Sequence, residues 1–441
     1  MTEADVGDAV HGAELKEAWP VLAREDRAEG FRLLPRGESD DFFLDLGAHD
    51  QADLLLALPR EERRLWIRLL APDDAADLIQ EVPAEERPAV LDLLDALTRK
   101  EVNALLAYAE DAAGGLMSPR YARLRPDMTC DEAISYLRRQ GREPLETIYE
   151  LYVLDERGVL LGVVSLRDLF LSQPGKRVRE VMNTEVVKAR DDLDQEALSK
   201  LFAEHDLTAI PIVDAEDRMK GIVTVDDIVD VVQEEATEDI HKLGGMEALD
   251  APYFSVSFFD MVKKRGGWLA ALFLGETLTA TAMAHFEDEI AKAVVLALFV
   301  PLIISSGGNS GSQATTLVIR AMALGEVRLR DWWRVIHREI GTGLALGTFL
   351  GAIGFMRIAI WQAISPLYGE HWMRVAFTVF GSLIGVVTFG TFAGSLLPFI
   401  LRRLGFDPAS ASAPFVATLV DVTGLVIYFS VASAILTGTL L

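Results

Sequence analysis

The stretch ATLVDVTGLVIYFSVASAIL (417–436) places one carboxylate, Asp421, inside a run that otherwise has the length and apolar character of a membrane helix. A spanning helix needs about 20 mostly apolar residues, and a charge at mid-bilayer costs about 2.5–3.5 kcal/mol on insertion scales. No Lys or Arg lies within this run to neutralise the charge. A bound cation is the predicted partner, and a protonated Asp421 bonded to a neighbouring helix is the alternative.

Four other runs are long and apolar enough to cross a membrane, so five spans are expected, at about 268–286, 290–324, 335–363, 374–401 and 412–440. Basic residues cluster at 263–265, 328–338 and 402–403. By the positive-inside tendency these loops face the cytoplasm, which puts the N-terminus inside and the C-terminus outside. The chain is therefore expected to be a multi-pass protein of the plasma or inner membrane, in contact with lipid.

Charge divides the 441-residue chain into two parts, although the whole carries a net charge of −25 with 50% hydrophobic residues. Residues 1–262 hold 57 acidic and 29 basic side chains, whereas residues 263–441 hold 10 and 13. The first residues lack the basic and apolar segments of a cleaved signal, so the acidic part is expected in the cytoplasm. The single cysteine, Cys130, excludes an internal disulfide or a structural zinc site, and no nucleic-acid partner is expected.

The second span contains PLIISSGGNSGSQATTLVIRAMALGE (301–326), with three glycines, Gly307, Gly308 and Gly311. Each glycine lowers helix stability by about 1 kcal/mol, and freed backbone groups cannot face lipid. This predicts irregular backbone that lines a polar cavity, with Asn309, Ser312 and Gln313 supplying uncharged ligands and donors. Close helix packing through small residues is the alternative.

The last span carries a stripe of small and polar residues at helical spacing, which suits a water-lined path. The stripe comprises Pro414, Ala417, Thr418, Asp421 and Gly424, with Leu425, Tyr428 and Phe429 near its far end. A second intramembrane carboxylate, Glu276, lies in GETLTATAM (275–283), whose hydroxyls could satisfy it, so both a structural and a functional role stay open.

One carboxylate with neutral oxygens suits a hard cation, and the spans hold no His or Cys cluster that would favour zinc, copper or iron. Mg²⁺ dehydrates reluctantly and is commonly held by one or two carboxylates with several waters retained. A two-fold dimer would bring a second copy of Asp421 to the same axis. The sequence therefore favours a site for a hydrated divalent ion.

The acidic part contains two internal repeats. YVLDERGVLLGVVSLRDLFL (152–171) recurs 59 residues later as PIVDAEDRMKGIVTVDDIVD (211–230), preceded by LMSP (116–119) and VMNT (181–184) respectively. Each copy predicts strand, turn, strand and a Ser/Thr-led helix, and the doubled pattern resembles a tandem cystathionine-β-synthase-type (CBS) pair, a module that commonly senses adenine nucleotides or ions.

The second repeat is helical. DLLLALPREERRLWIRLL (53–70) recurs as DLIQEVPAEERPAVLDLL (77–94), which predicts a small helical solenoid. Residues 1–44 show no clear periodicity and are expected to be partly disordered.

A predicted helix in TVDDIVDVVQEEATEDIHKLGGM (224–246) precedes the first span. It places Asp227, Asp230, Glu234 and Glu238 on one face. Like charges at this spacing repel by a few tenths of a kcal/mol per pair. Divalent cations between this face and another acidic surface would reverse the sign, so an ion-dependent switch is predicted. An ordinary solvated acidic helix is the alternative.

At GGNSGSQATTLVIRAMALGE (307–326), LPFILRRLGFDPA (397–409) and ATLVDVTGLVIYF (417–429) the chain resembles the MgtE family of bacterial magnesium channels. The resemblance implies a multidomain fold: an all-α helical-repeat N-terminal domain, an α/β tandem CBS pair, an acidic connecting helix and a five-helix transmembrane domain. The expected boundaries are 1–44 for the N-terminal segment, 45–112 for the N domain, 113–178 and 179–232 for the CBS modules, 233–262 for the connecting helix and 263–441 for the membrane domain.

The resemblance also implies a homodimer with its pore on the two-fold axis, Mg²⁺ as substrate and regulator, and ATP at the CBS pair. The implied pore residues are Asp421, Asn309, Ala417, Thr418 and Gly308. The implied cytosolic sensors are Asp73, Asp77, Asp194, Glu196, Asp206, Asp227, Asp230, Glu235, Glu238, Asp239 and Asp407. The implied nucleotide-binding segment contains Arg167 and Asp168.

The predicted function is a Mg²⁺-selective, Mg²⁺-gated passive channel that mediates magnesium uptake and catalyses no reaction. Membrane potential would drive it with ~2.3 kcal/mol per charge per 100 mV, and no phosphate-binding loop suggests ATP-driven pumping. Two alternatives stay open: a broader transporter that also passes Mn²⁺, Co²⁺ or Ca²⁺, and a non-transporting CBS membrane sensor.

Overall fold

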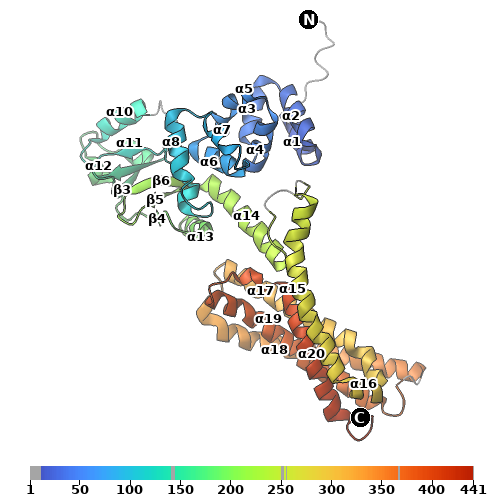
Figure 1. The fold of residues 1–441 in the computed structure, drawn as a ribbon. Coiled ribbons are helices and arrows are strands. Elements are labelled where there is room, and N and C mark those ends of the chain that lie inside the picture. The colour runs from blue at the N-terminus through green and yellow to red at the C-terminus, as the bar shows by residue number, and fades with distance from the viewer. Residues whose placement is uncertain (1–10, 141–144, 250–252, 255, 366–367, 441) are drawn as a thin grey trace. The chain divides into compact units, whose positions relative to one another are not determined.

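The computed structural model describes residues 11–140, 145–249, 253–254, 256–365 and 368–440 (Figure 1). The chain divides into two compact units, Met1–Glu235 and Ala236–Leu441. The first unit begins with short helices: α1 (Gly12–Ala18), η1 (Trp19–Val21), α2 (Arg24–Leu33), α3 (Arg36–Leu44), α4 (Ala48–Ala57), α5 (Arg60–Ile67), α6 (Pro72–Glu81), α7 (Arg87–Leu91), α8 (Ala96–Leu105) and α9 (Ala113–Leu116).

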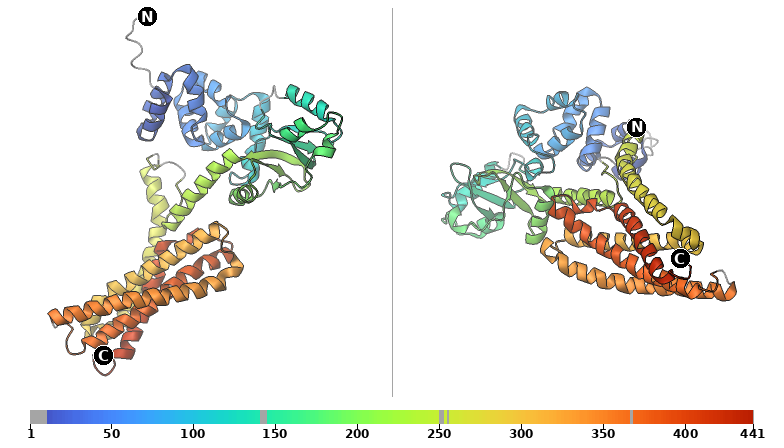
Figure 2. Two further views of the ribbon diagram at one scale, coloured as in Figure 1. Left: turned by 180° about the vertical axis from the view of Figure 1, so that it is seen from behind. Right: turned by 60° about the horizontal axis from the view of Figure 1, so that its bottom comes forward.

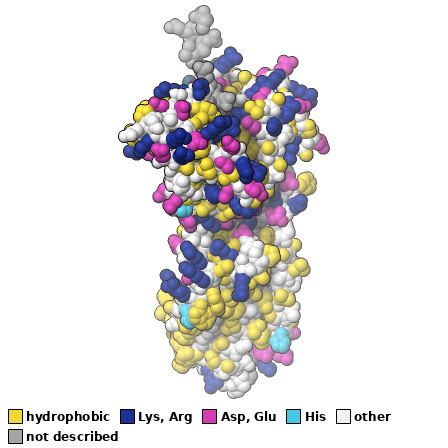
Figure 3. Space-filling model, turned by 90° about the vertical axis from the view of Figure 1, so that its left-hand side faces the viewer, with side chains coloured by type: hydrophobic (Ala, Val, Ile, Leu, Met, Phe, Trp, Pro, Cys, Tyr) yellow, Lys and Arg dark blue, Asp and Glu magenta, His cyan; other side chains and the backbone are white. Residues whose placement is uncertain are grey.

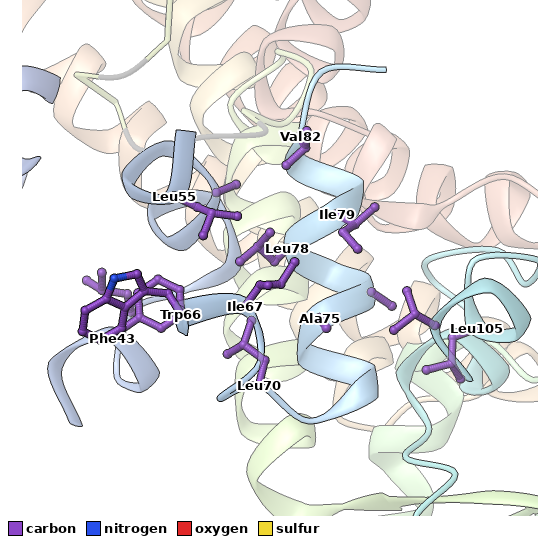
Figure 4. Packing of buried hydrophobic residues seen from close by; sticks show 14 of the residues in the cluster. Phe43, Leu55, Trp66, Ile67, Leu70, Ala75, Leu78, Ile79, Val82 and Leu105 are labelled. Carbon is purple, nitrogen blue, oxygen red and sulfur yellow. The ribbon is translucent and has the colours of Figure 1, made fainter. Parts of the chain in front are cut away.

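These helices share one hydrophobic core, in which Phe43, Leu55, Ile67 and Leu78 are fully buried (Figure 4). The expectation of disorder is therefore wrong for residues 12–44, which form α1, α2 and α3, while residues 1–10 lie outside the described residues. The physical reason is that aromatic side chains supply the burial that pays for ordering this segment.

The 24-residue helical repeat has a structural counterpart in two arginines. Arg63 Nε donates to the carbonyl of Leu58 at 2.9 Å, and Arg87 Nε donates to that of Val82 at 2.7 Å. Each guanidinium thus satisfies a carbonyl at the C-terminal end of the preceding helix, α4 or α6, which has no partner within that helix.

Two three-stranded sheets follow, with orders β1-β2-β3 and β4-β5-β6. In each sheet the first pair of strands is parallel and the second antiparallel, and helices lie around the strands (Figure 1). The elements are β1 (Arg123–Leu124), α10 (Cys130–Gln140), β2 (Glu150–Leu154), β3 (Leu160–Ser165), α11 (Leu166–Leu171), α12 (Val178–Val181), β4 (Ala189–Arg190), α13 (Gln195–His205), β5 (Ala209–Val213) and β6 (Met219–Thr224).

The 59-residue repeat is confirmed in the hydrogen bonds that begin the last helix of each module. Ser165 Oγ donates to Asp168 Oδ2 at 2.7 Å, and Thr224 Oγ1 donates to Asp227 Oδ2 at 2.8 Å. The same hydroxyl–carboxylate pair therefore caps α11 and α14 (Val225–Leu243).

The two modules exchange their leading segments. Gly162 of the first sheet contacts the VMNT segment, where a Cβ would lie 2.7 Å from the Asn183 carbonyl oxygen. Gly221 of the second sheet contacts the LMSP segment, where a Cβ would lie 2.6 Å from the Ser118 carbonyl oxygen. The repeated glycines are needed because each sheet accepts the segment that leads into the other module.

The second unit contains the five expected spans, Phe258–His285, Val294–Ala323, Leu329–Ile364, Trp372–Arg403 and Ala413–Leu436. The second to fifth spans pack against one another, as Figure 2 illustrates. Hydrophobic side chains dominate the face of this unit in Figure 3. The elements are α15 (Phe258–His285), α16 (Glu287–Lys292), η2 (Val294–Phe299), α17 (Val300–Ala323), η3 (Leu329–Asp331), α18 (Trp332–Ile364), α19 (Trp372–Arg403), η4 (Pro408–Ser410) and α20 (Ala413–Leu436).

The expected break in the second span is wrong, because α17 is a continuous helix through all three glycines. Gly311 packs against the Gly390 backbone, where a Cβ would lie 3.1 Å from the carbonyl oxygen. A Cβ on Gly394 would in turn overlap the Gly311 carbonyl oxygen. The missing side chains let α17 and α19 approach closely, and this packing compensates for the low helix propensity of glycine.

Candidate ion-conducting site

The second and fifth spans meet at Asp421. A Cβ on Gly308 of α17 would lie 3.3 Å from Ala417 Cβ and 3.7 Å from Asp421 Oδ1 of α20. Thr418 lies one turn before Asp421 and donates its hydroxyl to the Pro414 carbonyl at 3.0 Å. The absence of a side chain at Gly308 therefore leaves the Asp421 carboxylate uncovered on the side of α17.

Asn309 follows Gly308 but has a different environment. Its side chain is exposed, and its Nδ2 donates to Ser305 Oγ at 3.3 Å. In a single chain, four of the five expected pore residues therefore lie in direct proximity, while Asn309 projects from the neighbouring position of α17.

The stripe on α20 is accessible only along its first half. Ala417, Thr418 and Asp421 are half-buried, and among the described residues Asp421 has no hydrogen bond or ion pair. Farther along, Leu425, Tyr428 and Phe429 are fully buried, and the Tyr428 hydroxyl donates to the Leu296 carbonyl at 2.9 Å. The expected water-lined stripe therefore ends near Asp421, because its far end belongs to the hydrophobic core of the membrane unit.

Several expected sensor residues come together inside the first unit. Asp73 and Asp77 of α6 interact electrostatically with Asp227 at the start of α14, and Glu234 of α14 acts on Asp77. Asp230 lies on the same helix and acts on Asp74. Two acidic surfaces, one from α6 and one from α14, thus face each other as the switch hypothesis requires.

Burial and mutual repulsion raise the pKa values of these carboxylates. Burial, followed by the charges of Glu146 and Asp74, raises the pKa of Asp73 well above its ordinary value. Burial, followed by Asp74 and Asp227, raises the pKa of Asp77 to about 8. Burial also raises the pKa of Asp227 to about 7, although the hydrogen bonds from Thr224 oppose the shift. Ionising this cluster therefore costs free energy unless a cation enters.

The remaining expected sensors of the CBS pair are spread along α13. Asp194 caps the start of this helix by accepting from the Glu196 amide at 2.9 Å, and Glu196 pairs with Lys200 at 2.6 Å. Asp206 ends the helix with φ 50°, about 18 Å away at 1.5 Å per residue. Within one chain the structure therefore does not bring Asp206 to Asp194. Glu235 accepts a hydrogen bond from Gln195 at 2.7 Å.

In the second unit a lysine joins two expected sensors. Lys242 Nζ lies 2.5 Å from Glu238 Oε1 and 2.6 Å from Asp407 Oδ2, and Asp239 follows Glu238 on the same helix. Burial alone would lower the pKa of Lys242, but the hydrogen bonds to Asp407 and Glu238 outweigh it and raise the pKa above its ordinary value. A protein cation therefore occupies a place between carboxylates that the resemblance assigned to ions.

The end of α14 also packs on the membrane helices. Leu243 contacts the small hydrophobic cluster of Ile319, Ala409 and Ala411. Asp407 holds the adjoining turn by accepting from the Ala409 amide at 2.8 Å. The C-terminal end of the connecting helix is thus docked at the ends of α17 and α20 that lie next to the loop 402–412.

A hollow of about 830 Å³ opens in the CBS pair. Both expected nucleotide-binding residues, Arg167 and Asp168, line it. The other lining residues are Tyr149, Glu150, Ser165, Leu166, Phe170, Leu171 and Thr208, so the second module contributes one of them.

Sequence reasoning missed residues whose position depends on contacts between distant segments. Asp74, Glu110 and Glu146 act on the acidic cluster, and Lys242 bridges two expected sensors. Asp74 could have been found from the sequence, because it directly follows the expected sensor Asp73 in PDDAADL (72–78). Among the described residues no three His, Cys, Asp or Glu side chains form a ready-made metal site.

Five apolar helices with an accessible intramembrane carboxylate, preceded by a CBS pair, define a multi-pass membrane transport protein with a cytosolic N-terminal region. Family models match along the chain: a divalent cation transporter model at residues 300–431, an MgtE intracellular N domain at 10–111, and CBS domains at 113–174 and 178–234. The chain belongs to the MgtE family of magnesium transporters.

Curated relatives extend along most of the chain. The magnesium transporter MgtE of Thermus thermophilus is 46% identical over 345 residues, which cover 78% of this chain and 74% of that protein. The magnesium transporter MgtE of Enterococcus faecalis is 34% identical over 334 residues, covering 76% and 71%. A crystal structure of the cytosolic domain of the Mg²⁺ channel MgtE in complex with ATP is 44% identical, covers 50% of this chain and 90% of that chain, and has a TM-score of 0.47.

Proposed function

We propose that this chain is a Mg²⁺-selective channel that mediates magnesium uptake as a homodimer. The observation that carries the proposal is the half-buried Asp421 carboxylate, which has no hydrogen bond or ion pair among the described residues, faces Gly308 of α17 and belongs to the stripe of small residues on α20. A charge at this depth needs a partner, and a hydrated divalent ion shared with a second Asp421 on a two-fold axis would supply it. The odd number of spans then places the C-terminus outside.

The test is Mg²⁺ flux into liposomes that contain the purified protein, compared with protein-free liposomes. Flux that Mn²⁺, Co²⁺ and Ca²⁺ fail to compete would support selectivity. Equal competition by these ions would favour the broader divalent-cation transporter. Zero flux from folded protein would favour the membrane sensor.

We further infer that cytosolic Mg²⁺ closes the channel by neutralising the acidic surfaces of α6 and α14. Buried Asp73 and half-buried Asp77 and Asp227 repel one another when ionised, so the interface weakens without ions. The contact of Lys242 with Asp407 would keep the end of α14 at the membrane helices when the interface closes.

We also keep the domain boundaries predicted from the sequence as part of this proposal.

This gating proposal predicts that Mg²⁺ slows cleavage of α14 by a glutamate-specific protease, because the interface closes around Glu234. Protons neutralise the same carboxylates, because burial raises the pKa of Asp77 to about 8 and that of Asp227 to about 7 in the closed interface. Since raising the pH from about 6 to about 8 ionises this cluster, the Mg²⁺ concentration for half-protection should rise over that range.

The double variant Asp73→Asn/Asp77→Asn should resist cleavage even in a chelator and should respond less to Mg²⁺, because two of the repelling charges are removed. Asp92→Asn, at an exposed position of the same domain, is the matched control and should behave as wild type. Identical cleavage of the wild-type protein with Mg²⁺ and with a chelator would refute the switch and leave the pore proposal intact.

We also propose ATP as a ligand of the CBS hollow. Arg167 can pair with phosphate, Asp168 can accept from ribose hydroxyls, and the exposed rings of Tyr149 and Phe170 can stack on adenine. Arg167→Ala should weaken ATP binding about tenfold in calorimetry, since a charge-assisted hydrogen bond is lost. Arg157→Ala, in the β2–β3 turn, should leave it unchanged. Wild-type protein that binds no ATP would contradict the assignment.

A further inference from the structure

The first span packs along the last span in parallel and in register. Near the middle of α15 a Cβ on Gly275 would lie 2.9 Å from Thr418 Cγ2. At its end the ring of Phe286 stacks on that of Phe429, with centroids 4.8 Å apart. Both pairs are separated by the same 143 positions in the sequence (418 − 275 and 429 − 286). Position 278 of α15 therefore lies at the same height along the helix axes as Asp421. Glu276 precedes this height by two positions, and Thr279 follows it by one.

Glu276 brings a second carboxylate to this level. It acts electrostatically on Asp421, and in the described part of the chain it has no hydrogen bond or ion pair. Two carboxylates that repel each other inside the bilayer are more costly than one. A cation bound between them removes both costs at once.

The threonines around Glu276 do not satisfy it. Thr277 donates to the Leu274 carbonyl at 2.6 Å, and Thr281 donates to the Thr277 carbonyl at 3.0 Å. Both hydroxyls are thus engaged with their own helix, which removes the hydroxyl-satisfied alternative for the glutamate in the described structure.

Thr279 differs from its neighbours. It is only 8% exposed and is the one buried residue of α15, and its hydroxyl has no hydrogen-bond partner among the described residues. It lies three positions after Glu276, hence on the same helix face, and beside the level of Asp421. A buried hydroxyl without a protein partner, at the height of two carboxylates, is a place where a water or an ion-bound water can supply the missing hydrogen bond.

We propose that Glu276, Thr279 and Asp421 form one binding site for a hydrated divalent cation, in which Glu276 determines the affinity for the ion. The inference rests on the proposed transport function and adds a second carboxylate from the first span of the same chain. Waters bound to Mg²⁺ donate hydrogen bonds to carboxylates, and the Thr279 oxygen can accept one more. The site binds the ion with its water shell retained, which suits Mg²⁺ because this ion dehydrates reluctantly.

The experiment measures Mg²⁺ flux into liposomes as a function of Mg²⁺ concentration, with and without hexaamminecobalt(III), a substitution-inert complex that stands for a fully hydrated ion. Glu276→Gln should raise the half-saturating Mg²⁺ concentration about tenfold and weaken the cobalt block, because the site loses one of its charges. Glu276→Asp should restore part of the affinity. Thr279→Val should raise the half-saturating concentration a few-fold, whereas Thr277→Val is the matched control and should match wild type.

The outcomes separate this inference from the transport proposal. If wild type conducts, Asp421→Ala does not, and Glu276→Gln keeps the wild-type half-saturation and cobalt block, the shared site is overturned while the channel stands. Wild type without flux would overturn both. If Glu276→Gln aggregates on size-exclusion chromatography, the Mg²⁺ flux of Thr279→Val is the deciding measurement. A half-saturating Mg²⁺ concentration of Thr279→Val equal to that of wild type would then overturn the inference.

Discussion

Asp421→Ala will reduce Mg²⁺ uptake in a transport-deficient host about a hundredfold, to the level of cells without the protein. A fixed carboxylate offsets a cost of about 3 kcal/mol for bringing charge to mid-bilayer, and each 1.4 kcal/mol corresponds to a factor of ten. Half-buried Asp421 has no described protein partner, so its carboxylate is free to offset the charge of an ion.

The same substitution should not lower the melting temperature of the detergent-solubilised protein, because it removes an unpaired charge from a span. A loss of Mg²⁺ uptake with an unchanged melting temperature is the result expected for a residue that binds the ion. Thr423→Val is the matched control two positions away, where the hydroxyl donates to the Leu419 carbonyl of its own helix at 2.8 Å. Normal growth of the Asp421→Ala strain on low Mg²⁺ would refute the pore assignment.

Gly394→Val will prevent the membrane unit from assembling. A Cβ at this position overlaps the Gly311 carbonyl oxygen and lies 2.8 Å from Thr315 Oγ1. Thr315 Oγ1 donates to the Gly394 carbonyl at 2.9 Å, so the added side chain would also separate this pair. Overpacking usually costs about 1–3 kcal/mol, and more where the opposing atom is backbone that cannot move aside.

The measurement is the yield of monodisperse protein and its melting temperature after extraction in detergent. Gly341→Val is the control, because a Cβ at Gly341 of α18 meets no atom within 4 Å. That variant should keep the yield and melting temperature of wild type. A Gly394→Val protein that is as stable as wild type would show that α17 and α19 do not pack as closely as described.

Patterns of period and repetition made much of the fold predictable. The apolar runs predicted five spans, and the 59-residue repeat predicted two modules. The Ser165–Asp168 and Thr224–Asp227 hydrogen bonds occupy equivalent positions in these modules. The spacing of Asp227, Asp230, Glu234 and Glu238 placed these carboxylates on one face of the helix α14. These features depend on local periodicity, which the chain carries in consecutive residues.

The errors have a common cause. Glycine counts predicted a broken second span, but the helix is continuous because α19 offers glycines at Gly390 and Gly394 for close packing. Residues 12–44 lack periodicity, yet Trp19, Phe31 and Phe43 bury themselves among later helices. In both cases a tertiary contact outweighed a local preference.

By itself the sequence determined which residues are membrane-embedded and that Asp421 is the charge to explain, since hydropathy and the cost of a buried charge are properties of consecutive residues. The tertiary structure alone decided which distant groups share a level: Asp73 and Asp77 opposite Asp227, Lys242 between Glu238 and Asp407, and Glu276 beside Asp421. The reason is that electrostatic energy depends on distances in space, and helix register sets those distances.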